Sequence, residues 1–402
     1  MKIGLISSTL PNPKFGGGAV TTYSMLMAIK KLSKDITLIV LDKSSLSKEI
    51  EKIYICKGIK IEYLKRSKSK NSLTKKLKVI FPFLFKFNGL YDYKYDLKTD
   101  FPLEEYEVIF AYHWEAIDFL SQIKNVYKIG LAGDPINHAI AFRDQRNIRE
   151  YKYSFKRKVY FFYRKLMTNY SLKRSMVSVL NNMDESGLFA AHHARELNFM
   201  GARKCVYINT PISLDLKDKK IYARKIKKFN ILMVGHLAGI STLEGINLFL
   251  NQVLPELKIK LRDDFIVTIV GQYEHAELKL INQLKNEKSI NLLGNIDNLA
   301  QQYENADLLL VPTPINLGIR VRILTAMMYG KLIVAHSSNK QGIPELINEK
   351  NCLLGRNGKE LSEQIIRVYK YKNSLNKISD DANKTFKKYF TTNNFSKRFS
   401  NI

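Results

Sequence analysis

Residues 318–335 read Gly318-Ile319-Arg320-Val321-Arg322-Ile323-Leu324-Thr325-Ala326-Met327-Met328-Tyr329-Gly330-Lys331-Leu332-Ile333-Val334-Ala335. The apolar spacing in the middle of this stretch predicts a helix over residues 321–329. Gly330 is the residue type that commonly ends a helix, and the apolar run after it predicts a strand over residues 332–335. A loop, a helix and a strand in this order are typical of an alternating α/β sheet.

The sequence before this stretch repeats the same alternation. Strands are predicted at residues 229–234, 265–270, 290–293 and 308–311. Helices are predicted at residues 243–257, 276–286 and 299–303. The C-terminal half is therefore expected to form a doubly wound, parallel sheet.

The N-terminal half shows the same order, with glycines at its first crossover. A strand over residues 3–7 precedes a loop ending in Gly16-Gly17-Gly18, and a helix and a second strand follow. Ligands bind at such crossovers in α/β sheets. Further strands are predicted at residues 60–63, 108–112, 128–132, 176–180 and 204–208, and a basic, aromatic helix at residues 152–174. At 402 residues, the chain is long enough for two domains.

The composition favours a folded protein with anionic partners. Apolar residues make up 45% of the chain, and 65 Lys and Arg against 37 acids give a net charge of +28. Such a charge favours nucleotide-sugars, anionic membranes or nucleic acid, although a general abundance of lysine explains it equally well. The three cysteines have no metal-type spacing. The N-terminus predicts a first strand and no signal peptide, so we expect a cytoplasmic protein.

The second half resembles the retaining glycosyltransferases of family 4, which have the GT-B fold of two Rossmann-like domains facing a central cleft. Residues 318–335 carry the resemblance most strongly. The other segments are Ile231-Leu232-Met233-Val234-Gly235, Thr268-Ile269-Val270-Gly271, Asn305-Ala306-Asp307-Leu308-Leu309-Leu310-Val311-Pro312 and Gln341-Gly342-Ile343-Pro344-Glu345. In the first half, the glycine loop and Asn209-Thr210-Pro211 fall where the family has them.

The resemblance predicts how the domains divide. Residues 1–215 would form the acceptor-side domain, and residues 216–381 would bind the nucleotide-sugar. A charged linker at residues 217–228 would join them. A helix over residues 382–402 would cross back to the first domain.

Two arginines are the main candidates for binding the donor diphosphate. Arg320 and Arg322 lie where a loop that contains Gly318 enters a helix. An arginine there can bridge diphosphate oxygens and offset the charge of the leaving nucleotide. The alternative is a solvated helix start, although a cation there opposes the helix dipole.

The sequence departs from the family at two positions. Members usually have a glutamate before Ala-Met and another eight positions earlier, but here Thr325 and Leu317 stand there. The resemblance assigns the second glutamate to the ribose hydroxyls, and Thr325 still offers one hydrogen-bonding hydroxyl. This change puts donor affinity and identity in question.

Two glycine-containing loops are further candidates for the donor site. Gly16, Gly17 and Gly18 allow close backbone approach to a phosphate or sugar at a helix start, or simply make a flexible loop. Gly235 and His236 follow a predicted strand, but the usual arginine and lysine of the family are absent from this loop. His236 could contact phosphate or be structural.

Two residues in the first half are candidates for catalysis. His113 and Asp134 both follow predicted strands, and the resemblance places a histidine that contacts the transferred sugar near His113. Asp134 could bind an acceptor hydroxyl, act as a base or cap a turn. His192 and His193 are adjacent in a predicted helix and so face different ways, which argues against a metal shared by that pair.

The resemblance implies transfer with retention of the anomeric configuration, without a metal or another cofactor. The acceptor would be a glycan or a lipid-linked molecule in bacterial surface polysaccharide or glycolipid synthesis. The basic, aromatic residues 66–98 and 152–174 suggest peripheral binding to an anionic membrane. Their aromatic side chains could equally face the core, with the lysines in water.

Three other functions compete with this interpretation. A non-catalytic partner that binds nucleotide-sugar is favoured by Thr325 and Leu317. Nucleic-acid binding is suggested by charge alone, without a recognisable module, and we expect no nucleic-acid partner. A hydrolase or an epimerase of the same two-domain shape is the third.

Overall fold

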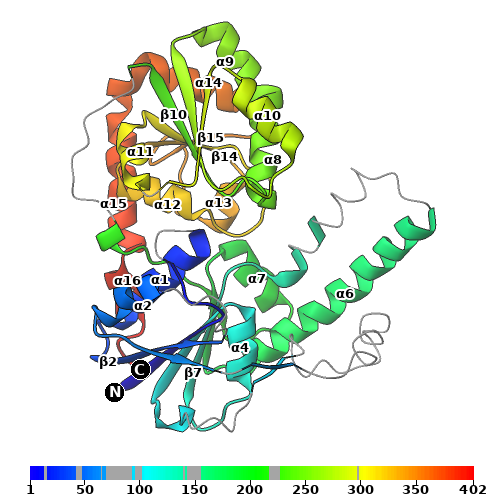
Figure 1. Cartoon of the computed structure of the whole chain (residues 1–402), viewed down its shortest axis with the longest axis vertical. Coiled ribbons are helices and arrows are strands. Elements are labelled where there is room, and N and C mark those ends of the chain that lie inside the picture. Colours follow the sequence, from blue (N-terminus) through cyan, green and yellow to red (C-terminus); the bar gives the residue numbers. More distant parts are fainter. Residues whose placement is uncertain are drawn as a thin grey trace. The chain divides into compact units, whose positions relative to one another are not determined.

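The computed structural model describes residues 1–12, 16–41, 48–64, 66–68, 93–95, 102–138, 141–142, 155–216, 227–296 and 298–402. The chain divides into two compact units (Figure 1). Unit 1 comprises Met1–Asn12, Met25–Asn209 and Ser396–Ile402, and unit 2 comprises Pro13–Ser24 and Thr210–Phe395. Residues 13–24 therefore group with the C-terminal half, and only the last seven residues, 396–402, group with the N-terminal half.

Unit 1 is built on a seven-stranded parallel sheet in the order β3-β2-β1-β6-β7-β8-β9. The strands are β1 (Lys2–Ser7), β2 (Asp35–Val40), β3 (Lys60–Tyr63), β6 (Val108–Tyr112), β7 (Tyr127–Ala132), β8 (Glu185–Leu188) and β9 (Cys205–Tyr207). A separate antiparallel pair joins β4 (Arg66–Lys68) to β5 (Tyr93–Tyr95).

The helices of the N-terminal half lie between these strands. They are α1 (Gly17–Ile29), α2 (Lys48–Ile55), η2 (Leu103–Glu105), α4 (Trp114–Ser121), α6 (Phe155–Asn181), α7 (Ala191–Phe199) and η3 (Leu214–Leu216). One core of unit 1 packs α4, the C-terminal part of α6 and α7 against the sheet.

One predicted strand is wrong. Residues 176–180 belong to α6, and the strand that pairs with β7 is β8. Met176, Val179 and Leu180 are buried at helical spacing, so the apolar run that suggested a strand is the core-facing side of a helix.

Unit 2 has a six-stranded parallel sheet in the order β12-β11-β10-β13-β14-β15. The strands are β10 (Phe229–Val234), β11 (Phe265–Val270), β12 (Ile290–Gly294), β13 (Leu308–Val311), β14 (Leu332–His336) and β15 (Leu353–Gly355). In β10, Ile231 and Met233 enter one core while Leu232 enters the other. Both faces are buried, which explains the uninterrupted apolar runs of these strands.

The helices of unit 2 cover the two faces of its sheet. They are α8 (Ile240–Leu248), the π-helical η4 (Phe249–Val253), α9 (Leu254–Leu261), α10 (Leu278–Asn286), α11 (Leu299–Asn305), α12 (Val321–Met328), α13 (Asn339–Gly342), α14 (Gly358–Tyr371), η5 (Lys372–Leu375) and α15 (Asn376–Tyr389). The last helix, α16 (Thr392–Arg398), begins in unit 2 and ends in unit 1. The first face packs α8, α9, α10 and α14, and the second packs α11, α12 and α15.

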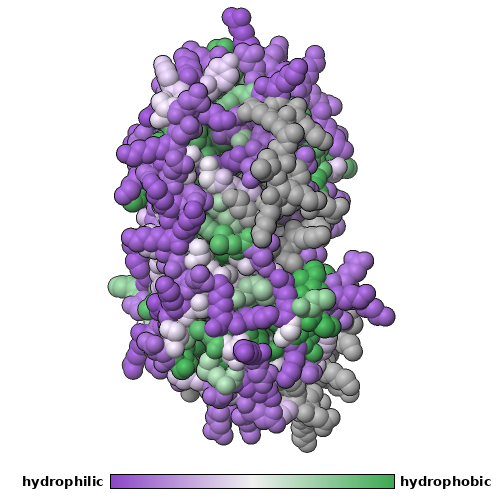
Figure 2. All heavy atoms as spheres, turned by 90° about the vertical axis from the view of Figure 1, so that its left-hand side faces the viewer, coloured by the Kyte–Doolittle hydropathy of each residue, from purple (hydrophilic) through white to green (hydrophobic). Residues whose placement is uncertain are grey.

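The surface and the cysteines agree with the composition. Hydrophilic side chains predominate among the described residues on the face in Figure 2. Cys56 is exposed, Cys205 and Cys352 are buried, and all three are free thiols. Among the described residues, none of the helices has both the length and the apolar character that crossing a membrane requires.

Candidate functional site

The strand order places a ligand-binding position in unit 2 between β10 and β13. The chain leaves these neighbouring strands in opposite directions, toward β11 and toward β14. Open α/β sheets bind ligands outside the carboxyl ends of the strands at such a switch point. Gly235 directly follows β10, and Pro312 and Thr313 directly follow β13. The predicted site residue Gly235 therefore lies at the switch point.

The loops at this edge come together through backbone that only glycine permits. Gly235 and Gly271 have φ angles of +154° and +151°. A Cβ on Gly271 would lie 1.9 Å from the carbonyl oxygen of Gly235. The Gly235 N–H donates to the Val270 carbonyl at 2.9 Å, and the Gly271 N–H donates to the Gly294 carbonyl at 2.8 Å. The strand ends of β10, β11 and β12 are thus fixed side by side.

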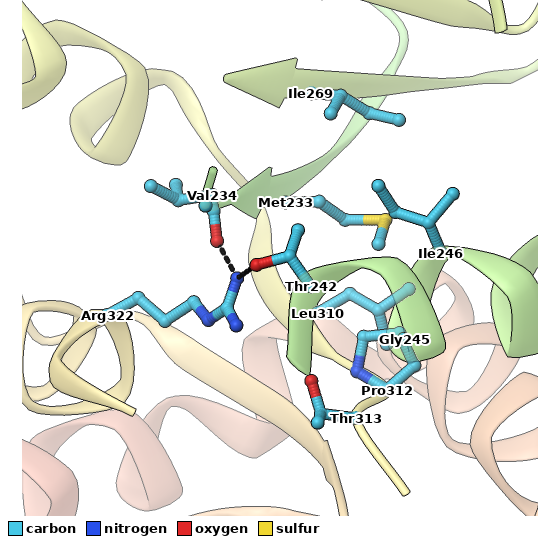
Figure 3. Close-up of a pocket in the computed structure, with 11 residues that line it drawn as sticks. Met233, Val234, Thr242, Gly245, Ile246, Ile269, Leu310, Pro312, Thr313 and Arg322 are labelled. Atoms are coloured by element: carbon cyan, nitrogen blue, oxygen red, sulfur yellow. Dashed lines mark hydrogen bonds between the residues drawn. The ribbon is translucent and has the colours of Figure 1, made fainter. Parts of the chain in front are cut away.

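Arg322 reaches across the switch point from α12 (Figure 3). Its guanidinium donates to the Val234 carbonyl at the end of β10, and to Thr242 Oγ1 on α8 at 3.4 Å. Burial of the guanidinium, followed by the charge of Arg320, lowers the pKa of Arg322 to about 9. Arg322 stays cationic at neutral pH, and among the described residues no carboxylate pairs with it. An anion at this edge would supply the missing negative charge.

The cavity beside Arg322 is small. It is lined by Val234, Gly235, Thr242, Thr313 and Arg322 among others, and its volume is about 10 Å³ (Figure 3). That volume holds about one water molecule. A nucleotide would therefore have to bind against the loops that border this cavity and not inside it.

Arg320 faces its own loop. It is 7% exposed, directly precedes α12, and donates to the carbonyl oxygens of Leu317 and, at 3.2 Å, Ile315. Gly318, with φ +61°, makes the turn inside this loop. The guanidinium thus holds the loop ahead of α12, a structural role that the sequence did not suggest.

At the two positions where the family has glutamates, the side chains of this protein contribute to its fold. The Thr325 hydroxyl donates to the Val321 carbonyl, one helical turn earlier, at 3.1 Å. Leu317 is buried. Such a back-bond within a helix occupies the hydroxyl that we expected to face a ribose.

The glycine loop of the N-terminal half lies against α12. Gly17 begins α1, and a Cβ on it would lie 3.2 Å from a methyl group of Val321, the first residue of α12. Gly16 has φ +79°, and Gly16, Gly17 and Gly18 are exposed. Both segments belong to unit 2, so the structure brings the predicted glycine loop beside the start of the predicted arginine helix. His236 is exposed in the turn before α8.

In unit 1, His113 and Asp134 follow neighbouring strands. β6 and β7 are paired, and each residue comes after the carboxyl end of its strand. His113 has φ +74° and precedes α4. Burial lowers its pKa to about 4, so the imidazole is neutral at physiological pH. It lies at the switch point between β1 and β6.

Sequence reasoning missed two sets of residues. Thr242 and the Val234 carbonyl, which hold Arg322, have no motif that marks them. His138, His193 and Glu196 form a cluster in unit 1, with all ligand atoms within 4.8 Å of one another. The i, i+3 spacing of His193 and Glu196 on one helix was a usable signal, but His138 is distant in sequence.

Comparison with protein families identifies part of the chain. Residues 228–371 match the model described as Glycosyl transferases group 1. This part of the chain, about a third of it, is similar to the group 1 glycosyl transferases. The matched residues include Gly235, His236, Gly318, Arg320, Arg322 and Thr325. No curated protein matches the chain.

Comparison with solved structures confirms the GT-B fold of two Rossmann-like parts. Anabaena Alr3699/HepE, in a complex with UDP and glucose, has 14% identity and a TM-score of 0.69, and the match covers 100% of this chain and 98% of that one. Sucrose-phosphate synthase from Thermosynechococcus elongatus has 12% identity and a TM-score of 0.66, covering 100% and 97%. S. aureus TarM has 11% identity and a TM-score of 0.66, covering 100% and 99%.

Proposed function

We propose that this protein is a retaining glycosyltransferase that moves a sugar, of the hexosyl type, from a nucleotide-sugar to a glycan or a lipid-linked acceptor. The match of residues 228–371 to the group 1 glycosyl transferases carries the proposal. The cationic Arg322 at the switch point, without a carboxylate partner among the described residues, supports an anionic donor.

The donor is proposed to bind at the edge where β10 and β13 end. The loops after these strands would approach the diphosphate through backbone N–H groups, and Arg322 would offset its charge. Gly16 to Gly18 lie beside the start of α12 and would contact the phosphate or the sugar. No metal or other cofactor is part of this proposal. Because the Anabaena structures contain UDP or UDP-glucose, uridine nucleotides are the first donors to test.

In unit 1, His113 and Asp134 are proposed to serve the sugar and the acceptor. A neutral His113 can donate or accept a hydrogen bond from a sugar hydroxyl without adding charge. Asp134 would bind or deprotonate the acceptor hydroxyl. The remaining work is positioning and charge stabilisation, which needs no protein nucleophile.

A lipid-linked acceptor would place the protein on the cytoplasmic face of a membrane. The outer part of α6 extends away from the sheet of unit 1 (Figure 1). It exposes a row of apolar side chains at helical spacing: Phe155, Val159, Phe162, Leu166 and Tyr170. Lys156 and Lys158 are also exposed on this helix. Apolar and basic groups together favour an anionic bilayer surface.

The other aromatic residues of this hypothesis give no further support. Phe81, Phe83 and Phe85, and the side chain of Phe161, lie outside the described residues. Flotation with anionic vesicles tests the surface of α6. Replacing Phe155 and Phe162 by serine should abolish flotation at moderate salt, whereas Phe199→Ser, at a 93% exposed position on α7, should leave it intact. Equal flotation of both variants would refute a role for α6.

A second function has support from the structure. Arg320 and the Thr325 hydroxyl both bond backbone carbonyls, and Leu317 is buried where the family has a glutamate. These residues therefore serve the fold, which favours a partner that binds nucleotide-sugar without transferring it.

Release of nucleoside diphosphate separates the two functions. The protein is incubated with a panel of nucleotide-sugars, with and without a bacterial lipid extract as the acceptor source. The transferase predicts diphosphate release that depends on the extract, and NMR of the product should show the anomeric configuration of the donor. Asp134→Asn should slow this release without weakening donor binding. Donor binding without release in any combination would reject the transferase and support the non-catalytic partner.

A further inference from the structure

A cluster of two histidines and a glutamate lies in unit 1, apart from the residues that we assign to the donor. His138 lies in a helical segment that begins at Ile136, after β7, and His193 and Glu196 lie on the first turns of α7. His193 is fully buried, whereas His138 and Glu196 are partly exposed. One ligand atom from each residue lies within 4.8 Å of the others.

The distances around Glu196 are close to those in a metal site. His138 Nε2 lies 2.7 Å from Glu196 Oε2, and His193 Nδ1 lies 3.7 Å from the same oxygen. The rings of His138 and His193 are 4.7 Å apart between centroids. Bonds of about 2.0–2.1 Å in tetrahedral zinc sites put ligand atoms roughly 3.3 Å apart. An ion could enter if His138 and Glu196 separated by about half an ångström, replacing the proton that they share.

The surroundings prepare the carboxylate to bind an ion. Lys173 of α6 contacts Glu196 Oε1 at 3.1 Å, so its ammonium orients the carboxylate while Oε2 faces the histidines. The hydrogen bond with His138, followed by the nearby His193, holds the pKa of Glu196 well below its usual range. A carboxylate fixed by an outer partner is characteristic of metal ligands.

Asp134 faces the other ring nitrogen of His193. Its Oδ1 lies 3.8 Å from His193 Nε2, and Asp134 is partly exposed. Imidazole nitrogens with carboxylate oxygens suit zinc and similar divalent ions, whereas magnesium and calcium prefer oxygen alone. Two histidines and a glutamate leave a coordination position for a water molecule, and Asp134 would orient His193 from its Nε2 side.

We infer that His138, His193 and Glu196 bind a divalent ion of the zinc class, with water as the fourth ligand. The site ties α7 to the helical segment that follows β7, beside Asp134. The inference does not depend on the proposed transferase activity, because its tests measure the ion itself.

The first test is zinc binding by the full-length chain without a polyhistidine tag. After treatment with a chelator, the protein is titrated with ZnCl₂ by calorimetry, and bound zinc is counted by elemental analysis. We expect one zinc ion per chain. Glu196→Gln and His138→Gln should each weaken binding at least tenfold, whereas His275→Gln, which changes an exposed histidine of unit 2, should not. No binding by the wild type, or equal binding by Glu196→Gln, would overturn the inference.

A second test needs no variant and so avoids the risk of misfolding. X-ray absorption at the zinc edge of the loaded wild type should show two imidazoles and oxygen ligands. Zinc should also raise the melting temperature, because an ion that binds only the folded state stabilises it. A zinc shell of water or sulfur, or an unchanged melting temperature, would contradict the site.

Discussion

Replacing Arg322 by methionine should leave the ligand-free protein at least as stable as the wild type while weakening its affinity for nucleotides. Methionine keeps much of the side-chain length and removes the guanidinium. The variant therefore loses the hydrogen bonds to the Val234 carbonyl and to Thr242 Oγ1. It also loses a buried cation whose hydrogen-bond acceptors here are uncharged.

Two opposing contributions set the expected change in stability. A buried carbonyl left without its donor costs about 1–3 kcal/mol. The pKa of Arg322 falls from 12.5 to about 9, a difference of 3.5, and at about 1.4 kcal/mol for each pH unit the buried charge costs at most about 5 kcal/mol. We therefore expect the free energy of unfolding to stay the same or rise by up to about 4 kcal/mol.

Chemical denaturation and calorimetric titration of the same two proteins test this expectation. A charge-assisted hydrogen bond contributes about 1.5–3 kcal/mol, so nucleotide affinity should fall roughly tenfold to a hundredfold. Thr242→Val is the matched control, because it removes one neutral partner of Arg322 and keeps the charge. If Arg322→Met loses more than about 2 kcal/mol of stability and keeps its nucleotide affinity, Arg322 is a structural residue and does not bind the nucleotide.

Three further predictions follow from single contacts. Gly271→Ala places a Cβ 1.9 Å from the Gly235 carbonyl oxygen and should destabilise unit 2 by about 3 kcal/mol or more in thermal unfolding. The control Gly58→Ala, with open space around the new Cβ, should lower the free energy of unfolding by about 1 kcal/mol. Burial lowers the pKa of His113 from 6.5 to about 4, so between these pH values the unfolded state binds a proton that the folded state does not. Between pH 6.5 and 4, the free energy of unfolding of the wild type should therefore fall by about 3 kcal/mol more than that of His113→Asn. An equal pH dependence of the two proteins would contradict this. Thr325→Glu, which supplies the carboxylate that the family has, should strengthen nucleoside binding severalfold in calorimetry, and unchanged affinity would show that ribose is not held here.

The fold could be predicted from the sequence because its signals are local. Apolar runs such as Phe265–Val270 and Leu308–Val311 match strands residue for residue, since both sheet faces are covered. The strand predicted at residues 176–180 is wrong, although it depended on the same signal, a short apolar run, as the strands that were predicted correctly. A short apolar run does not distinguish a strand from the buried side of a helix, and only the length of α6 settles it.

The candidate site could be predicted only in part. Gly235 and the loop ahead of α12 follow from strand ends and glycines, which are visible in the sequence. The direction of each arginine was not predictable, because it depends on long-range partners: Arg322 bonds a carbonyl 88 residues away, while Arg320 bonds one only three residues away. The cluster of His138 with Glu196 likewise joins residues 58 positions apart, through the packing of α7.

The proposed donor site at the ends of β10 and β13 can be tested by calorimetric titration of the wild-type chain with a panel of nucleotide-sugars. We expect at least one nucleotide-sugar to bind, with one site per chain. Its free nucleoside diphosphate should compete for that site, and Arg322→Met should abolish or strongly weaken both. If every nucleotide-sugar in the panel fails to bind at millimolar concentration, the donor site at the ends of β10 and β13 is wrong.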